Sequence, residues 1–522
     1  MAMIIRAPCD EGVIRAAGAS APVAGRHWTL IAAILGSSMA FMDGTIATVA
    51  LPAIARDLSA TAAQLQWVVE SYSLLLSSLV LVGGSLGDRF GRRRIFGIGV
   101  ATFAAASAGC GMAQTIGQLI ALRALQGIGA ALLVPGSLAL ISAAYPERDR
   151  GRAIGTWSGS SGITAALGPI LGGWLIEHQS WRWAFFINMP LAAAVLALLW
   201  SRVAESRDEH ATGRIDWPGA MLASAGLGAI VYGLIEIPAR GWSSPVILIA
   251  LIGGVLSLGA FVWLEATVPS PMLPLGVFRS RMFSGTNLLT LLLYAALGGA
   301  LFFLPLNLIQ VQGYSATAAG AALVPLIAIM FTLSRWAGGL VARYGSRGPL
   351  ILGPAIAAAG FALLGLPAVG GHYWSTFLPG IVVLGFGMVM TVAPLTTTVM
   401  SSVGQEQAGV ASGINNAVAR TAGLMAVAVL GIVVGTVFSN RLQTRLEGRP
   451  IPVAARQSLL DQRTKWAGAQ VPADVSDGQR AVIRRDIDES FVAGFRVAMF
   501  ASALLALLAA ASAVLFVGST QK

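Results

Sequence analysis

The chain has 522 residues, of which 56% are hydrophobic and only 11% are Asp, Glu, Lys or Arg. An average soluble domain carries about 25% charged residues, so this composition excludes an ordinary soluble globular protein. The formal net charge of +11 is high enough for nucleic-acid binding, but the arginines cluster in short loops between apolar segments, which argues against that function.

Apolar segments recur along the chain at lengths that suit a membrane. About 20 helical residues, rising ~1.5 Å each, cross the hydrocarbon core of a bilayer. Because backbone polar groups in lipid must be satisfied within each segment, we expect an all-α polytopic membrane protein. Fourteen transmembrane helices are predicted, near residues 28–52, 66–87, 95–113, 118–144, 152–176, 183–202, 217–237, 245–264, 284–309, 317–342, 349–369, 375–400, 409–438 and 493–517.

The arginines are divided unequally between the two sides of these predicted spans. Short loops on one side carry fourteen arginines, whereas short loops on the other side carry three. The positive-inside rule therefore places both termini in the cytoplasm. Residues 440–492 lie on the outer side although they carry nine Lys or Arg and seven Asp or Glu, and we expect them to form a folded or amphipathic external hairpin.

No motif for ATP binding, metal binding or hydrolysis is visible. The only lysines are Lys465 and Lys522, and neither lies in a GxxxxGK[ST] loop. The four histidines fall in loops or at span ends, without an HExxH pair or a Cys/His cluster. We therefore expect a transporter and not an enzyme, with no cofactor and no metal. A non-transporting membrane sensor is the alternative from another class, and it would need a large soluble signalling domain that the sequence does not show.

Asp43 is the only charged residue between His27 and Ala55. A carboxylate in the hydrocarbon costs about 2.5–3.5 kcal/mol on insertion scales, so a function is expected for it. Glu70 and Arg123 lie at a similar depth in their spans, and the three side chains can meet. An arginine that switches between two carboxylates makes protonation depend on conformation, as proton coupling requires. The alternatives are a static Asp43–Arg123 bridge and, for Glu70, a side chain that reaches the outer interface.

The loop after the second span reads GSLGDRFGRR (residues 84–93), which matches the G-x-L-x-D-R-x-G-R-R loop of the major facilitator superfamily residue by residue. RALQG (123–127) resembles the fourth-span motif of that superfamily, and GITAALGPILGG (162–173) resembles its fifth-span antiporter motif. Three further segments are similar to the branch of fourteen-span drug:proton antiporters of the EmrB/QacA type: MDGTIATVALPAIARDL (42–58), WRWAFFINMP (181–190) and GVASGINNAVARTAG (409–423). The resemblance covers essentially the whole chain.

This resemblance implies a major facilitator fold of two six-helix halves with two inserted central helices. The boundaries are a cytoplasmic N-terminal tail at 1–27, a first half at 28–202, cytoplasmic linkers with the inserted spans at 203–283, a second half at 284–517 that contains the external loop 440–492, and a cytoplasmic tail at 518–522. A faint internal repeat supports the two halves, because GGLVARYGSR (338–347) aligns with residues 84–93. Ala342 stands where the first copy has Asp88, so any charge-based lock should depend on the first half.

The first-copy loop is a candidate gate latch formed by Asp88, Arg89, Gly91 and Arg92. On a tight cytoplasmic turn that Gly91 permits, the acid can pair with arginines or face a helix N-terminus in one conformation and not in the other. The alternative is an ordinary basic loop, which explains the arginines but not Asp88.

The fifth-span motif contains a candidate antiporter hinge, formed by Gly168, Pro169, Gly172 and Gly173. These small residues let two helices approach closely, and the proline removes one backbone hydrogen bond. A hinge and a simple packing face are both open at this stage.

Several polar and aromatic side chains are candidates for the lining of a substrate cavity. The polar members can equally form helix-to-helix hydrogen bonds, the aromatic members can face lipid or core, and Arg420 can stabilise helix ends or carbonyls. The candidates are Phe41, Tyr72, Gln126, Trp157, Asn287, Tyr294, Asn307, Arg335, Asn415, Asn416 and Arg420.

We therefore expect a proton-coupled antiporter of the bacterial inner membrane that exports amphipathic small molecules, in multidrug efflux, by alternating access. Its expected partners are the substrate, protons and the lipid bilayer, but not nucleic acid, and the sequence identifies no envelope partner protein. A dedicated exporter of a single metabolite or siderophore is the alternative within transport. Because the second half contributes cations and not acids to its spans, we expect rigid dications to be excluded.

Overall fold

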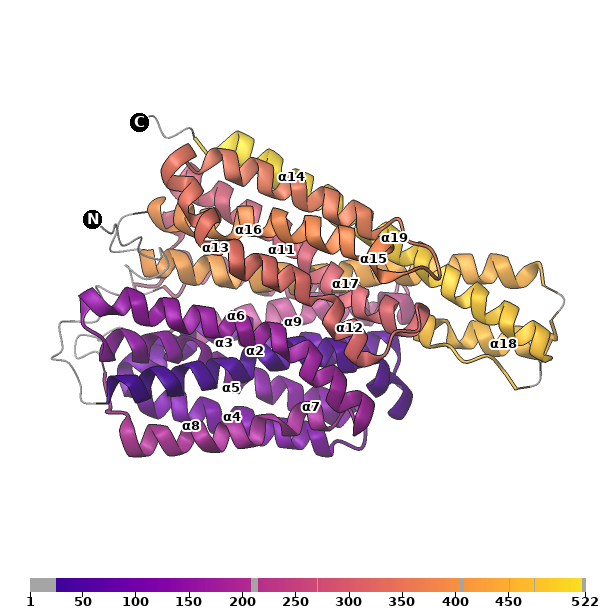
Figure 1. Ribbon diagram of the computed structural model, residues 1–522, viewed down its shortest axis with the longest axis horizontal. Helices are drawn as coiled ribbons and strands as arrows, with labels where there is room; N and C mark the ends of the chain where they lie inside the picture. Colours follow the sequence, from indigo (N-terminus) through magenta and orange to yellow (C-terminus); the bar gives the residue numbers. More distant parts are fainter. Residues whose placement is uncertain are drawn as a thin grey trace.

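The structure is a computed structural model that describes residues 25–207, 215–269, 271–403, 408–449, 451–473 and 475–518. All regular secondary structure in these ranges is helical, and the long helices run side by side in an elongated bundle (Figure 1). Fourteen helical segments among the described residues are long and apolar enough to cross a membrane. The predicted all-α polytopic fold with fourteen spans is thereby confirmed.

The first six spans begin at Arg26 and end at Arg202. Two of them start at a capping box, in which Thr61 pairs with Gln64 and Thr115 pairs with Gln118. Each threonine side chain accepts a backbone N–H while the glutamine side chain accepts the threonine N–H, so two backbone donors are satisfied. The helices are α2 (Arg26–Asp57), α3 (Ala62–Phe90), α4 (Arg92–Met112), α5 (Ile116–Ala144), α6 (Glu147–His178), and α7 (Trp183–Phe186) followed by α8 (Asn188–Arg202).

The last six spans form the second half of the bundle. The predicted span 317–342 is divided in two at Leu323, because Pro325 lies at the start of the next helix and cannot donate a backbone hydrogen bond. The helices are α11 (Arg281–Leu306) with η3 (Asn307–Val311), α12 (Ala316–Ala322), α13 (Val324–Tyr344), α14 (Arg347–Leu364), α15 (Tyr373–Thr376), α16 (Leu378–Ser401), α17 (Ala408–Glu447) and α19 (Asp477–Phe516).

The two ends of the bundle differ. At the basic end, α2 begins, α19 ends and the arginine-rich turn joins α3 to α4 (Figure 1). At the opposite end, which we call the hairpin end, α17 and α19 extend beyond the other helices. They are joined there by α18 (Val453–Asp461) and η5 (Gln462–Gly468). Both long helices continue well past the predicted span limits near residues 438 and 493.

Charge pairs hold the extended helices together. Asp486 of α19 is buried and accepts hydrogen bonds from Arg445 of α17 at 3.0 Å and from Arg449, just after the end of α17, at 2.9 Å. Trp466 of η5 packs against Phe303 and Phe491, which anchors the hairpin to the bundle. The spans predicted from hydropathy end too early because these extensions are polar, although they are helical.

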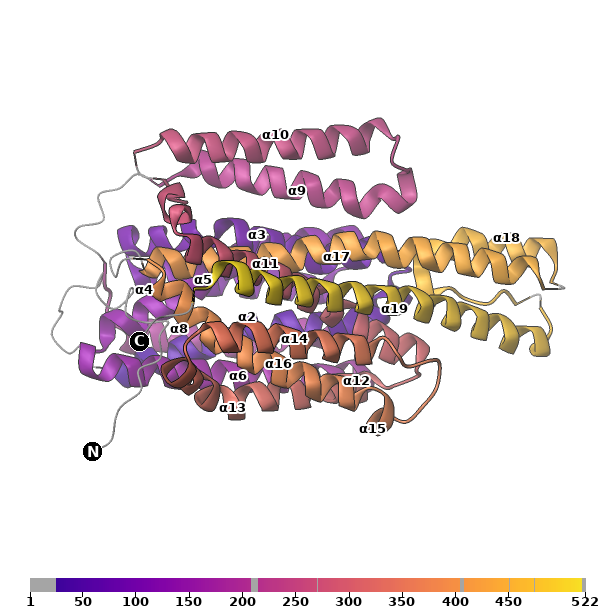
Figure 2. The same ribbon diagram turned by 90° about the horizontal axis from the view of Figure 1, so that it is seen from above.

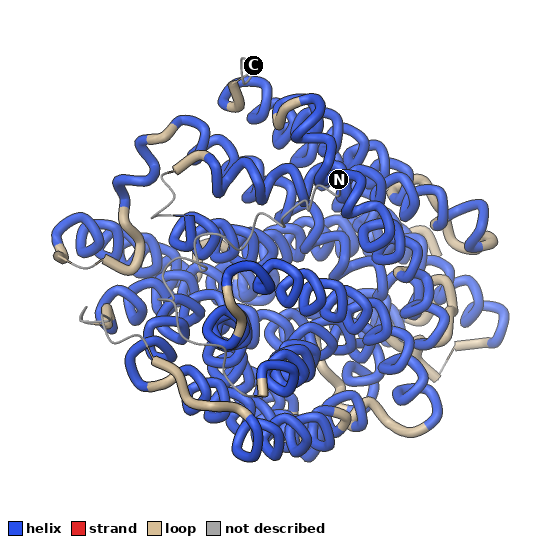
Figure 3. The backbone as a smooth tube through the Cα atoms, turned by 60° about the vertical axis from the view of Figure 1, so that its left-hand side comes forward, coloured by secondary structure: helices blue, strands red, loops and turns tan. Residues whose placement is uncertain are grey.

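The inserted helices α9 (Trp217–Arg240) and α10 (Pro245–Thr267) lie at the edge of the bundle (Figure 2). α9 covers the junction between the halves, where Val231 packs with Leu74 of α3 and Leu424 of α17. α10 packs on α9 and leaves large apolar side chains such as Ile249 and Trp263 exposed, as a lipid-facing helix does. Figure 3 shows that the described chain consists of helices joined by loops.

Candidate transport site

A buried polar network surrounds Asp43 of α2. The Asp43 carboxylate accepts hydrogen bonds from Arg123 Nη1 and, at 2.8 Å, from Gln126 Nε2. Arg123 and Gln126 lie three residues apart on one face of α5, and Arg123 Nη1 also donates to Gln126 Oε1 at 2.7 Å. Arg123 Nε donates to the carbonyl oxygen of Val68 in α3 at 3.0 Å. Asp43 is 2% exposed and Arg123 1%, so the ion pair is shielded from solvent.

Further side chains of the first half extend this network. Asn188 Nδ2, at the start of α8, donates to Asp43 Oδ1 at 3.5 Å and to Ser107 Oγ of α4 at 3.0 Å. The Tyr72 ring lies 4.4 Å from the Arg123 guanidinium in a cation–π contact. Asn188 is not among the site residues predicted from the sequence, although an asparagine in an apolar span is a usable signal. Every residue of the network belongs to the first half.

Glu70 lies apart from this network, in the wall of a cavity between the two halves. The cavity has a volume of about 220 Å³. Glu70 is buried, and its Oε2 has no hydrogen-bond partner among the described residues. Val68, whose carbonyl oxygen accepts the hydrogen bond from Arg123, precedes Glu70 by two residues on α3. The same helix therefore contacts the Asp43–Arg123 network and carries the acid that lines the cavity. The polar lining comprises Thr48, Glu70, Ser73 and Ser77 from the first half, and Tyr294 and Arg420 from the second.

The lining of the cavity contains one acidic residue, one basic residue and several apolar residues. Glu70 and Arg420 face it from different halves, and no ion pair within 4.0 Å joins them in the described part of the chain. Leu297, Leu301 and Phe302 supply apolar surface. Such a lining suits an amphipathic molecule, but pockets for drug-sized ligands measure about 300–1,000 Å³, so a larger ligand requires the halves to separate.

Four other predicted cavity residues form contacts between helices and do not line the cavity. Phe41 packs edge-on against Trp157, whose Nε1 donates to Ser37 Oγ at 2.9 Å, so this pair joins α2 to α6. Asn415 Nδ2 donates to Asn287 Oδ1 at 3.2 Å and to Thr290 Oγ1 at 2.6 Å, so these residues join α17 to α11.

Three remaining candidates lie elsewhere. Asn307 is buried in η3 at the hairpin end, where its Oδ1 accepts a hydrogen bond from Gln312 at 3.1 Å. Asn416 is exposed and donates to the carbonyl oxygen of Ser412, one turn back in α17. Arg335 lies on α13, but its side chain is outside the part of the structure that is described.

The candidate hinge in α6 is closely packed on one side against α2. A Cβ atom at Gly168 would overlap Thr45 Oγ1, and a Cβ atom at Gly172 would lie 2.6 Å from the Ile46 side chain. A side chain at either position would therefore displace Thr45 or Ile46, so the two glycines allow this close approach of the two helices.

The other side of the same α6 segment packs against the second half. A Cβ atom at Gly173 would lie 2.5 Å from the carbonyl oxygen of Ala316 in α12. A Cβ atom at Gly320 of α12 would in turn overlap the carbonyl oxygen of Pro169. The motif thus lies at the junction between the halves.

Side-chain hydrogen bonds between the halves lie near the hairpin end in the described structure. Thr317 Oγ1 of α12 donates to Glu177 of α6 at 2.6 Å. Gln66 Nε2 of α3 donates to the carbonyl oxygen of Val427 in α17 at 2.8 Å. These contacts and the α6 glycines hold the halves together at that end.

At the basic end, Asp88 and Arg92 flank the turn between α3 and α4. Arg92 Nε and Nη2 donate to Asp88 Oδ1 at 2.9 Å and 2.8 Å. The turn residue Gly91 has a φ of 107°, a conformation that favours glycine. Arg89 extends over the exposed Phe90 ring at 5.5 Å. The predicted latch residues therefore include one local ion pair, Asp88–Arg92.

Glu205, which is not among the site residues predicted from the sequence, caps the start of α4. Its two carboxylate oxygens accept hydrogen bonds from the backbone N–H groups of Arg93 at 2.9 Å and of Arg94 at 3.1 Å. A carboxylate at a helix N-terminus is favoured by the helix dipole. Glu205 also contacts Gly91, where a Cβ atom would lie 2.7 Å from its carboxylate carbon. The segment after α8 thus supports the turn from outside the motif.

A polytopic helical bundle with a cavity between two six-helix halves defines a membrane transporter. Residues 33–428 match the family described as the Major Facilitator Superfamily, and the chain belongs to this family.

Curated relatives align over most of the chain. It is 34% identical over 498 residues to the "Tetracenomycin C resistance and export protein" of Streptomyces glaucescens, covering 94% of this chain and 91% of that protein. It is 36% identical over 494 residues to the "Multidrug resistance protein Stp" of Mycobacterium tuberculosis, covering 92% and 90%. It is 37% identical over 428 residues to the "Puromycin resistance protein pur8" of Streptomyces alboniger, covering 80% and 84%.

A solved structure shares the fold. The crystal structure of a bacterial homolog to the human lysosomal transporter Spinster superposes with a TM-score of 0.65, covering 96% of this chain and 100% of that chain. The two sequences are 18% identical, so this likeness concerns the fold alone.

Proposed function

We propose that this protein is a proton-coupled antiporter that exports amphipathic small molecules, antibiotics among them, by alternating access. The observation that carries the proposal is the cavity between the halves, which Glu70 and Arg420 line from opposite sides, together with the buried Asp43–Arg123 pair that contacts the same helix α3 through Val68. The names of the relatives, which refer to tetracenomycin C, puromycin and multidrug resistance, support drug export.

The proposed proton coupling uses two acids, Asp43 and Glu70, which differ in their hydrogen-bond partners. Asp43 accepts hydrogen bonds from Arg123, Gln126 and Asn188, so it can take up a proton only after this network rearranges. Glu70 has an unpartnered oxygen beside the cavity, where a proton or a cationic group of the substrate can serve as its partner. Because α3 carries Glu70 and also contacts Arg123, a movement of α3 can link the two acids.

The proposed orientation places the basic end in the cytoplasm of a bacterial cell, with both termini inside and the hairpin outside. The arginine distribution supports it through the positive-inside rule. In this orientation Asp88 and Arg92 act as a cytoplasmic latch, and the α6 segment from Gly168 to Gly173 acts as the hinge near the outer end. The two six-helix halves would then rotate about the cavity.

The cavity charges define the proposed substrates. One acid and one arginine line it, so its formal charge is balanced. Neutral, zwitterionic and singly charged molecules leave at most one unpaired charge in the low-dielectric site, whereas a rigid dication leaves more. A dedicated exporter of one compound remains the second candidate, since two of the relatives are named after single antibiotics.

The test uses purified protein in proteoliposomes that contain a pH-sensitive dye. A neutral antibiotic, a carboxylate drug, a monovalent lipophilic cation and a dication of similar size are added under an imposed proton gradient. We expect substrate-dependent proton movement with the first three compounds, abolished by a protonophore. Proton movement with a single compound would support the dedicated exporter, and efficient transport of the dication would contradict the charge argument.

A further inference from the structure

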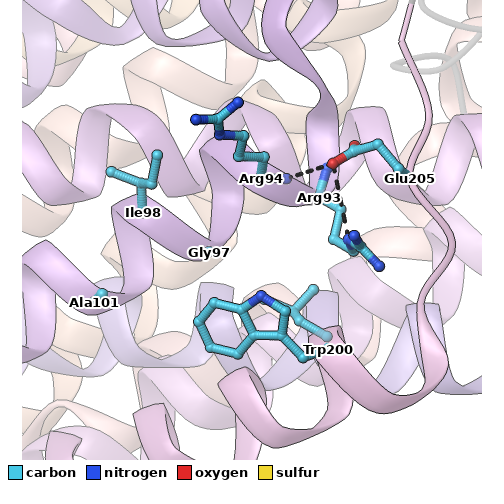
Figure 4. Close-up of a pocket in the computed structure, with 8 residues that line it drawn as sticks. Arg93, Arg94, Gly97, Ile98, Ala101, Trp200 and Glu205 are labelled. Carbon is cyan, nitrogen blue, oxygen red and sulfur yellow. Dashed lines mark hydrogen bonds and ion pairs between the residues drawn. The ribbon is translucent and has the colours of Figure 1, made fainter.

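A second cavity lies on the outside of the first half, at the basic end of α4 and α8. We call it the α4–α8 groove. It has a volume of about 430 Å³ (Figure 4). It is separate from the central cavity and shares no residue with it. The lining residues are Arg93, Arg94, Gly97, Ile98, Ala101, Leu199, Trp200 and Glu205.

The floor of the groove is apolar and open because its residues are small. Gly97 and Ala101 lie one turn apart on α4, and a Cβ atom at Gly97 would be in ordinary contact, 3.7 Å from Leu199 of α8. Ile98 is 45% exposed and Trp200 66% exposed at its edges. Since the helices cross a membrane, these exposed side chains must be covered by lipid.

The mouth of the groove carries an arginine with no partner for its side chain. The Arg94 guanidinium is exposed and makes no hydrogen bond or ion pair within the described residues, and Figure 4 shows it directed away from Glu205. Glu205 is already engaged by the backbone N–H groups of Arg93 and Arg94 and, at 3.1 Å, of Ser206.

The neighbouring arginine is also engaged. Arg93 Nη1 donates to the carbonyl oxygen of Val203 at 3.0 Å, and its Nε lies 3.8 Å from Glu205. The charges of Arg93 and Glu205 therefore offset each other, and Arg94 leaves one positive charge at the mouth of the groove.

We propose that the α4–α8 groove binds one anionic phospholipid of the leaflet that faces the basic end. The phosphate diester pairs with the Arg94 guanidinium, whose geometry matches phosphate oxygens. One acyl chain lies over Gly97 and Ala101, which are about 4.5 Å and about 10 Å deeper along α4 than Arg94 at ~1.5 Å per residue. The Trp200 indole lies at the membrane–water interface, where tryptophan is enriched.

The choice of a lipid with a net negative headgroup follows from the charges. The groove has one uncompensated positive charge, which a phosphodiester monoanion neutralises. The ammonium of a zwitterionic headgroup would need a negative charge beside it, but the charge of Glu205 is already offset by Arg93 and its oxygens accept three backbone N–H groups. Free phosphate would match Arg94 but would leave the apolar floor uncovered.

The test uses the full-length protein in nanodiscs with a trace of phosphatidylglycerol that carries a diazirine on one acyl chain. After illumination, labelled peptides are mapped by mass spectrometry. We expect labelling of α4 around residues 97–101 and of the facing part of α8. A matched phosphatidylcholine probe should label these peptides about fivefold less, because one arginine near an anionic headgroup contributes about a fivefold preference.

Variants separate the headgroup contact from the chain contact. Arg94→Gln should lower phosphatidylglycerol labelling about fivefold, and Arg94→Lys should keep most of it. Ala101→Phe should fill the floor and lower labelling by either probe. Arg279→Gln, which alters an exposed arginine at the same end outside the groove, is the matched control and should change nothing.

Several results would overturn the proposal. Equal labelling by the two probes, unchanged labelling in Arg94→Gln, or absence of label from α4 and α8 would each do so. Displacement of the label by millimolar inorganic phosphate would indicate a free-anion site and not a lipid site. Because labelling is measured without transport, failure here is distinguishable from failure of the antiporter proposal.

Discussion

The turns at the basic ends of the two halves both contain a glycine with a positive φ, but they differ in charge. The turn between α3 and α4 reverses at Gly91 with a φ of 107°, and the turn between α13 and α14 reverses at Gly345 with a φ of 74°. Asp88 and Arg92 flank the first turn, whereas Ala342 and Ser346 occupy the aligned positions in the second. The turn geometry therefore requires the glycine and not the ion pair, which leaves Asp88 free for another role.

The interiors of the two halves differ in the same way. The first half encloses the Asp43–Arg123 ion pair, whereas the α11–α17 contact of the second half uses the neutral side chains of Asn287, Thr290 and Asn415. A buried ion pair is sensitive to protonation, and loss of one partner leaves an uncompensated buried charge, whereas loss of a partner from the amide network removes only neutral hydrogen bonds. We therefore expect charge-changing substitutions to have their largest effects in the first half.

Asp43→Asn is expected to have the largest effect. The amide cannot exchange a proton, so transport driven by a pH gradient should fall to the level of protein-free liposomes. Arg123 would remain as a buried unpaired charge, which costs about 3–5 kcal/mol of stability. Transport in proteoliposomes and thermal unfolding measure the two effects.

The double variant Asp43→Asn, Arg123→Gln controls for folding. It removes both charges, so most of the lost stability should return while proton-driven transport stays absent. Undiminished transport by Asp43→Asn under an imposed pH gradient would eliminate Asp43 from the coupling mechanism.

Glu70→Gln is expected to rank second. The substitution keeps the shape of the cavity wall but removes its acid, so proton movement coupled to a cationic substrate should be lost. Binding of a neutral substrate should change by less than about threefold, or about 0.65 kcal/mol. Glu236→Gln, which alters an acid paired with Arg240 outside the cavity, is the control and should behave as wild type. Equal loss of binding for neutral and cationic substrates would argue for a structural role instead.

Asp88→Asn tests the difference between the two turns directly. Loss of the pair with Arg92 should slow turnover about tenfold, equivalent to about 1.4 kcal/mol in the barrier, and leave the substrate Kd unchanged. Arg343→Gln, on the exposed turn of the second half, should change turnover by less than twofold, within about 0.4 kcal/mol. Stopped-flow transport and equilibrium binding separate the two quantities. A turnover equal to that of wild type at equal expression would refute the latch.

Asn415→Leu should have the smallest effect. Loss of its hydrogen bonds to Asn287 and Thr290 should cost about 0.6–1.7 kcal/mol of stability, between the average and the maximum measured for such bonds between membrane helices. Transport should stay within about twofold of wild type, since no charge is lost. Asn416→Leu, at the exposed neighbouring position, is the control for thermal unfolding. A complete loss of proton coupling in Asn415→Leu would contradict the proposal that proton coupling depends on the first half.

The amino-acid sequence by itself determined the number of spans and the family motifs. Each span needs about 20 apolar residues, so hydropathy reports the crossings without knowledge of packing. It also indicated that Asp43 and Arg123 meet, because few charges lie in the spans and a buried charge needs a partner. The ends of α17 and α19 could not be located from hydropathy, since their polar extensions are held by ion pairs such as Asp486 with Arg445.

The tertiary structure alone decided which side chains share a site. Glu70 has nearly the depth of Asp43, but two residues along a helix turn the side chain by about 200°, so α3 directs Val68 to the Arg123 network and Glu70 to the central cavity. Glu205 meets the start of α4 only because the chain returns there after α8. Helix rotation and long-range approach depend on packing between distant segments, and a single sequence does not encode them as a local pattern.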